Sequence, residues 1–335
     1  MTEKQTPKKR RWLRVLLVII GVIVVIDIVA VFYFFNVSQV RNNKPVTSEV
    51  KTTSKNYPLV VAFDKLPKTT ETLENHGVKL SAWYVPAAVK TSKTVIVVHG
   101  YRSDRAAMRQ YAELYHKLGY NVLVPDNRGA GASGGNLISY GYWDKYDIIA
   151  WAKKLVAADS NVDITLFGVS MGGATVMMAS GEASLPKNVS SIIEDCGYTN
   201  VFDEVSYQAK AMYNLPNFPI VYEVSLMSQI RAGWSYQAAS STKELAKDTR
   251  PILFIHGTAD TYVPYYMLNQ NIAALKKGTP YEVLRVKGAK HAMSFETNPS
   301  AYEAAVSKFL KVYNPVSTSS SAKTTDTVKP VSKTA

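Results

Sequence analysis

Short runs of β-branched and apolar residues alternate, along the middle of the chain, with longer segments in which apolar residues recur every three or four positions. The short runs predict eight strands, at residues 69–74, 78–85, 94–98, 121–124, 164–167, 191–194, 252–255 and 281–286. The longer segments predict helices at 104–118, 143–157, 171–180, 265–276 and 299–312, with Ser103 expected to cap the first of them and Gly119 to end it. Strands that alternate with helices indicate an α/β protein with a mostly parallel sheet.

The N-terminal region carries a different pattern, an apolar run at residues 15–35 whose single charge is Asp27. At about 1.5 Å per residue this run spans roughly 31 Å, which is enough for a helix to cross a bilayer. Five basic residues precede it, and they predict a cytoplasmic N-terminus (residues 1–14) with the rest of the chain outside: Lys8, Lys9, Arg10, Arg11 and Arg14. A cleaved signal peptide is the alternative, but no A-x-A site follows the run. We therefore expect a single-pass bacterial cell-membrane protein.

Two polar segments flank the predicted enzyme domain, which we place at residues 58–314. Residues 36–57 are rich in Asn, Lys, Ser and Thr and are expected to form a linker. Residues 315–335 contain mostly Ser, Thr, Lys, Ala and Val, and such a tail cannot bury enough apolar surface to order itself.

Residues 198–248 interrupt the alternation of strands and helices. A structureless loop of that length is uncommon inside a domain. The segment is rich in aromatic residues, and we expect a small helical cap over the active site, with Tyr198 and Trp234 in the substrate pocket. An additional layer of core is the alternative.

The chain has 335 residues and a net charge of +13, part of which lies in its two ends. The remaining basic excess is modest and forms no stripe with aromatic residues, so nucleic acid is not expected as a partner. The membrane, a small ester or acyl substrate and an anionic cell-envelope polymer remain the expected partners. Cys196 is the sole cysteine, so no intramolecular disulfide can form.

The segment Gly168-Val169-Ser170-Met171-Gly172 lies between a predicted strand and a predicted helix. A G-x-S-x-G segment in this position is typical of the nucleophile of a serine hydrolase. The serine needs a base, and the base needs an acid that fixes its tautomer. Asp260 and His291 each follow a predicted strand, at 252–255 and 281–286. The order Ser, Asp, His beyond the ends of strands predicts a catalytic triad.

On these residues and motifs, residues 66–313 resemble the α/β-hydrolase superfamily, in particular its membrane-anchored bacterial serine hydrolases and prolyl-oligopeptidase-like esterases. The resemblance implies Ser170 as nucleophile, His291 as general base and acid, and Asp260 as the residue that orients His291. It also implies an oxyanion hole formed by the backbone N–H groups of Met171 and Tyr101. His99-Gly100-Tyr101-Arg102 lacks the further glycines of the lipase-type loop.

Several other residues have competing interpretations. Asp195 follows its own strand and is an alternative acid, whereas His99 and His256 are expected to be structural and Cys196 to be a small buried apolar group. Residues 129–134 match G-x-G-x-x-G, but the third glycine continues a loop, so no nucleotide is expected. We expect Asp126 and Arg128 to pair and hold that loop. No metal-binding pattern is present, and the sequence implies no cofactor.

These observations predict an extracytoplasmic serine hydrolase, most simply a carboxylesterase, that cleaves an ester, thioester or amide through an acyl-enzyme. A prolyl-oligopeptidase-like peptidase is one alternative, although the chain has no room for a propeller domain. A cell-surface binding protein that retains the fold without turnover is the other.

Overall fold

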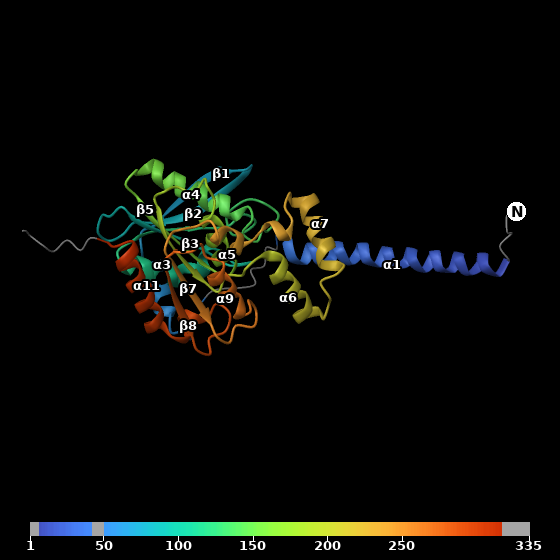
Figure 1. The fold of residues 1–335 in the computed structure, drawn as a ribbon. Helices are drawn as coiled ribbons and strands as arrows, with labels where there is room; N and C mark the ends of the chain where they lie inside the picture. Colours follow the sequence, from blue (N-terminus) through green and yellow to red (C-terminus); the bar gives the residue numbers. More distant parts are fainter. Residues whose placement is uncertain (1–6, 42–49, 317–335) are drawn as a thin grey trace, which may run out of the picture.

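An eight-stranded sheet forms the centre of the protein in a computed structural model that describes residues 7–41 and 50–316 (Figure 1). The strand order is β1-β2-β4-β3-β5-β6-β7-β8. β1 and β2 are antiparallel to their neighbours, and the other strands pair in parallel. The eight predicted strands and the mostly parallel sheet are confirmed, with bounds at Thr69–Asn75, Val78–Val85, Lys93–Val98, Asn121–Pro125, Asp163–Val169, Val189–Asp195, Ile252–Gly257 and Tyr281–Val286.

Helices cover both faces of the sheet because its central strands are apolar on both sides. Along β3, Val95 and Val97 pack in one core cluster and Ile96 and Val98 in the other, as the alternation of a strand requires. The first cluster includes residues of α2 (Tyr57–Asp64), α3 (Arg109–Lys117), α10 (Ser294–Thr297) and α11 (Pro299–Tyr313). The second includes residues of α4 (Asp144–Ala158), α5 (Met171–Ser180), α8 (Ser241–Leu245) and α9 (Tyr266–Ala273).

The helix expected at 104–118 begins as a 3-10 turn at Arg105–Met108 before α3. Its cap is Asp104 rather than Ser103, because Asp104 is extended and its carboxylate accepts a hydrogen bond from the backbone N–H of Ala106 at 2.8 Å. α2 begins at Tyr57, inside the segment expected to be a linker, and its buried side chains pack beside α3.

Helix α1 (Pro7–Gln39) extends away from the sheet in Figure 1. Its part from Arg11–Gln39 is long and apolar enough to cross a membrane. The helix continues four residues past the predicted span because its C-terminal end packs on the domain, where Phe35 and Gln39 are fully buried. Residues 1–6, 42–49 and 317–335, which belong to the expected basic N-terminus, linker and tail, lie outside the described residues.

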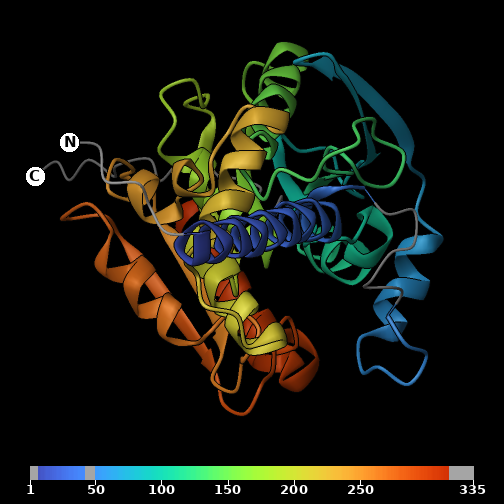
Figure 2. The ribbon, with the colours of Figure 1, turned by 90° about the vertical axis from the view of Figure 1, so that its right-hand side faces the viewer.

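The insertion between β6 and β7 folds as helices, mainly α6 (Val201–Tyr213) and α7 (Ile220–Ala232). Figures 1 and 2 show α6 and α7 on either side of the end of α1 that enters the domain. Residues of all three helices share a third apolar cluster with Trp234 and Tyr236. We call α6, α7 and residues 30–39 of α1 the roof.

Candidate active site

Ser170 occupies the sharp turn between β5 and α5, with φ 58° and ψ −118°. Few residues other than glycine adopt this backbone conformation without strain, and such strain is typical of functional turns. The flanking glycines allow the close packing of the turn. A Cβ atom at Gly168 would lie 2.1 Å from the carbonyl oxygen of Gly172, and one at Gly172 would lie 2.2 Å from that of Val98.

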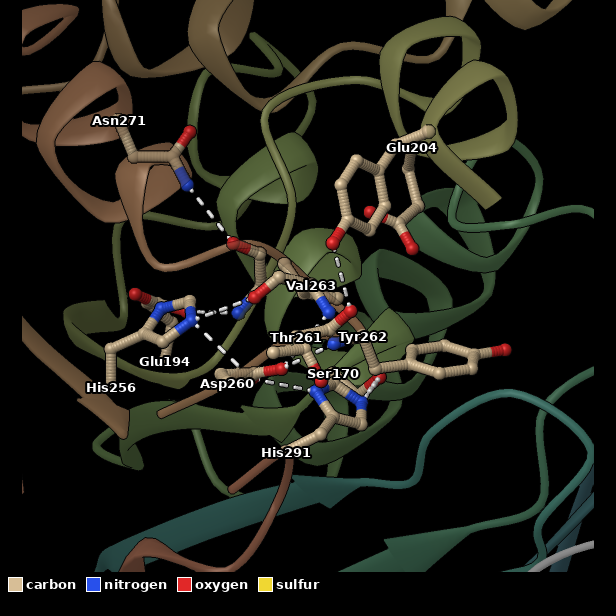
Figure 3. A network of polar contacts seen from close by, with 12 residues as sticks. Ser170, Glu194, Glu204, His256, Asp260, Thr261, Tyr262, Val263, Asn271 and His291 are labelled. Carbon is tan, nitrogen blue, oxygen red and sulfur yellow. Dashed lines mark hydrogen bonds and ion pairs between the residues drawn. The ribbon is translucent and has the colours of Figure 1, made fainter. Parts of the chain in front are cut away.

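The structure brings the three predicted triad residues into one hydrogen-bonded chain (Figure 3). Ser170 Oγ lies 2.8 Å from His291 Nε2, and His291 Nδ1 lies 2.8 Å from Asp260 Oδ2. The carboxylate of Asp260 can only accept, so Nδ1 carries a proton and Nε2 is left to accept the proton of Ser170. This arrangement lets the imidazole act as a base toward the serine.

Asp260 is held as an anion by its surroundings. Its Oδ1 accepts the backbone N–H groups of Tyr262 and Val263 at 2.9 and 3.0 Å, and His256 Nε2 lies 3.4 Å from Oδ2. Burial alone would raise the pKa of Asp260, but the hydrogen bonds with His256 and His291 outweigh it and lower the pKa to about 2. Asp260 therefore remains ionised across the physiological pH range.

Asp195 and Cys196 lie nearby but make different contacts. The hydroxyl of Tyr302 donates to Asp195 Oδ2 at 3.0 Å, and burial raises the pKa of Asp195 to about 6. Asp260, and not this alternative acid, contacts His291 in the described residues.

A possible metal site lies close to the triad. Cys196, Asp260 and His291 have potential ligand atoms within 4.8 Å of one another. Burial raises the pKa of the Cys196 thiol well above its usual value, which disfavours the thiolate that a metal would need.

The two residues expected to supply oxyanion donors border Ser170. Met171 begins α5, and the first N–H groups of a helix have no partner inside that helix. Gly100 packs on Ser170 so closely that its Cβ would lie 3.4 Å from that of the serine, and Tyr101 follows it along the same cavity wall. The Tyr101 side chain points elsewhere, because its hydroxyl donates to the carbonyl oxygen of Ser38 in α1 at 2.7 Å.

A cavity of about 850 Å³ extends from Ser170 and His291 beneath the roof. Tyr198, which was expected in the substrate pocket, lines this cavity. Trp234 does not belong to the described cavity lining, so that expectation is corrected: Trp234 is buried and stacks on Tyr142, with ring centroids 5.5 Å apart. Sequence reasoning missed Phe34 of α1 as a lining residue, because an apolar run of membrane length does not reveal which of its side chains meet the domain.

Glu204 of α6 was also missed, since a single acid on a helix gives no signal of burial. It lines the cavity and is almost fully buried, with Oε1 accepting from Gln208 Nε2 at 3.0 Å while Oε2 has no partner among the described residues. Burial raises the pKa of Glu204 to about 8, so the side chain is neutral at pH 7.

The loop after β4 is held differently from the expectation. Arg128 pairs with Asp147 of α4, through contacts of 2.7 and 2.6 Å, and not with Asp126. Asp126 instead accepts the backbone N–H groups of Arg105 and Ala132 and pairs with the Arg105 side chain at 3.4 Å. The partners come from distant segments, which local spacing in the sequence does not reveal.

Comparisons with known proteins agree with this geometry. The model of the prolyl oligopeptidase family matches residues 106–314. The chain is 28% identical to the uncharacterized protein YqkD of Bacillus subtilis over 268 residues, which cover 78% of this chain and 85% of YqkD. It is 24% identical to the uncharacterized protein YfhR of Escherichia coli K12 over 249 residues, covering 71% of this chain and 79% of YfhR.

Solved structures share the fold. The esterase Pf2001 of Pyrococcus furiosus superimposes with a TM-score of 0.62 at 24% identity, over 81% of this chain and 99% of the esterase. The acylaminoacyl peptidase of Pyrococcus horikoshii superimposes with a TM-score of 0.57 at 16% identity, over 75% of this chain and 43% of the peptidase. At these identities the likeness establishes an α/β-hydrolase fold and leaves the substrate open.

Proposed function

The chain belongs to the prolyl oligopeptidase family of serine hydrolases, and we propose that it hydrolyses carboxylic esters through Ser170, His291 and Asp260. The observation that carries this proposal is the continuous chain of two 2.8 Å hydrogen bonds from Ser170 through His291 to Asp260. A strained serine at a tight turn, paired with a correctly oriented base, has a direct use in nucleophilic catalysis and none in passive binding.

In the proposed reaction, Ser170 Oγ attacks the acyl carbonyl carbon while its proton moves to His291 Nε2. The bond to the leaving oxygen then breaks, and His291 returns the proton to the released alcohol. Water attacks the acyl-serine with the same transfer of a proton to His291 and back to Ser170, which frees the carboxylic acid. The backbone N–H groups of Met171 and Tyr101 stabilise the negative oxygen, and a single such donor is typically worth about 10²-fold or more in rate.

We further propose that α1 remains attached as a membrane anchor, with the hydrolase domain on the outside of the cell. Basic residues at 8–11 and 14 precede the apolar helix and favour a cytoplasmic N-terminus. The buried contacts of Val31 and Phe35 favour retention, because cleavage after these residues would remove the part of α1 that packs in the roof.

A peptidase would use the same three residues, and the family name keeps this alternative open. The cavity favours an ester. Its lining residues are mainly apolar and offer few partners to a peptide backbone.

Hydrolysis of p-nitrophenyl butyrate by the full chain in detergent tests the proposal. Ser170→Ala and His291→Ala should each lower kcat by about 10⁴-fold or more. Matched controls are Ser190→Ala, at the opposite end of β6 from the site, and His76→Ala in the turn after β1; both should retain the wild-type rate. An inactive wild type would favour a binding role, and an active Ser170→Ala variant would place catalysis elsewhere.

A further inference from the structure

The catalytic cavity reaches the side of the domain from which α1 emerges. We propose that the substrate is a long-chain acyl ester of a membrane lipid, and that its acyl chain enters the cavity directly from the outer leaflet of the bilayer. This inference rests on the proposed esterase function and adds the class and the source of the substrate. Each turnover consumes one water and releases the lipid alcohol and a fatty acid, with no further reactant.

Exposed aromatic residues on α1 locate the membrane surface. Trp12 lies near the start of the helix and Tyr33 near the end of its exposed part, and both side chains are exposed. They are about 21 residues apart, or roughly 32 Å along a helix, which matches the thickness of the hydrocarbon core. Aromatic residues concentrate at the two membrane interfaces. The outer interface therefore lies near Tyr33, next to the roof.

The roof meets α1 at this same level. The ring of Phe34 packs edge-to-face on that of Tyr213, at the end of α6, with centroids 5.1 Å apart. Val31 of α1 and Val224 of α7 belong to the same apolar cluster. Figure 1 shows α6 and α7 beside α1 where it joins the domain. The turn between α6 and α7 is thus placed at the membrane interface.

Exposed apolar side chains lie on this helix pair and on the turn between its helices. Four of them, which we call the outer patch, are Met212, Phe218, Tyr222 and Leu226, with exposed fractions of 63%, 71%, 48% and 59%. Ile220, Val221 and Val224 of α7 line the cavity, so α7 carries apolar side chains toward the cavity as well as in the outer patch. An exposed apolar patch marks a contact surface.

The cavity joins this surface to the site. Its volume of about 850 Å³ is large for a ligand pocket, and its walls are mostly apolar. Ser170 and His291 line it, and so do Phe34 of α1 and Met212 and Tyr213 at the end of α6. Met212 belongs both to the cavity lining and to the outer patch, so one side chain borders the lipid phase and the acyl pocket.

The test uses the full chain reconstituted in dioleoylphosphatidylcholine vesicles. The substrates are 4-methylumbelliferyl oleate, which partitions into the bilayer, and the water-soluble butyrate with the same leaving group. Phe218 and Leu226 lie outside the described cavity lining. The double variant Phe218→Ser/Leu226→Ser should therefore lower oleate hydrolysis in vesicles about tenfold, while butyrate hydrolysis stays within about twofold of wild type. Val312→Ser removes an equally exposed apolar side chain from α11, far from α1, and should change neither rate.

Two further experiments distinguish entry of the acyl chain from the bilayer from binding of the acyl chain in the cavity. Oleate delivered in detergent micelles should restore the double variant to within about twofold of wild type, because entry from a bilayer is no longer needed. Ala209→Trp narrows the cavity and should lower the oleate-to-butyrate ratio about tenfold in vesicles and in micelles.

The outcomes distinguish the two proposals. An enzyme that hydrolyses butyrate but not vesicle-bound oleate, or a double variant with unchanged oleate hydrolysis in vesicles, overturns the lipid inference and leaves the esterase intact. A double variant that stays impaired in micelles overturns entry from the bilayer. If neither ester is hydrolysed, the esterase function itself fails.

Discussion

The floor of the cavity, formed by Ser170, His291 and Asp260, is held by hydrogen bonds at the ends of buried strands. Its roof is held mainly by apolar contacts between three helices, with the buried Gln39 hydrogen-bonded to Ser228 and Tyr236. On the floor, Ser170, His291 and Asp260 each have a fixed partner at 2.8 Å. In the roof, side chains such as Phe35 and Val224 pack without a directional partner. Hydrogen bonds demand particular groups at particular positions, while apolar packing tolerates replacements of similar size. In the proposed enzyme the floor would define the reaction and the roof would define the substrate.

The largest expected effect comes from Asp260→Asn, which removes the carboxylate that orients His291 while the side chain keeps its shape. An amide in place of the carboxylate favours the wrong tautomer of His291, and kcat for p-nitrophenyl butyrate should fall about 10⁴-fold. Asp195→Asn is the matched control and should lose less than about tenfold, because Tyr302 rather than His291 is its partner. If the two variants had equal rates, Asp260 would not be the orienting acid.

Gly172→Ala should disturb the tight turn that positions Ser170. The added Cβ would lie 2.2 Å from the carbonyl oxygen of Val98, so β3 and α5 must separate. We expect a loss of more than about 3 kcal/mol in the free energy of unfolding, measured by urea denaturation in detergent. Gly134→Ala, with its nearest contact at 3.3 Å, should lose much less. Wild-type stability for Gly172→Ala would contradict the packing described for the turn.

Phe35→Ala tests whether α1 is part of the roof. Phe35 is buried in the cluster shared by α1, α6 and α7, and its loss should cost about 3 kcal/mol in the free energy of unfolding. Phe32→Ala removes an exposed ring from the same helix and should cost less than about 1 kcal/mol. Equal stability of the two variants would show that α1 is only a tether.

A smaller effect is expected for Glu204→Gln, and it depends on pH. The folded protein binds the Glu204 proton more tightly than the unfolded chain does, since the pKa rises from 4.5 to about 8. The free energy of unfolding of the wild type should therefore fall as pH rises from about 4.5 to 8, relative to the variant. Near pH 9 the variant should be the more stable of the two, and near pH 4 the gain should vanish. A gain independent of pH would exclude a protonated Glu204.

The same contrast explains what the sequence could predict. The glycines around Ser170 and the strands before Asp260 and His291 are local patterns, so the eight strands and the meeting of these three residues were predictable. The roof depends on which side chains of α1 face the domain. No local sequence pattern distinguishes Phe34, Phe35 and Gln39 from the other residues of that helix. The Asp104 cap and the pairing of Arg128 with Asp147 were missed for a related reason, because both depend on three-dimensional position.

The central claim is that Ser170 is the nucleophile of this hydrolase. Reaction of the full chain with a fluorophosphonate, followed by digestion and mass spectrometry, tests it directly. We expect a single phosphonyl adduct on the peptide that contains Ser170, and its absence in Ser170→Ala. An unlabelled wild type, or an adduct on another serine that persists in Ser170→Ala, would contradict the claim.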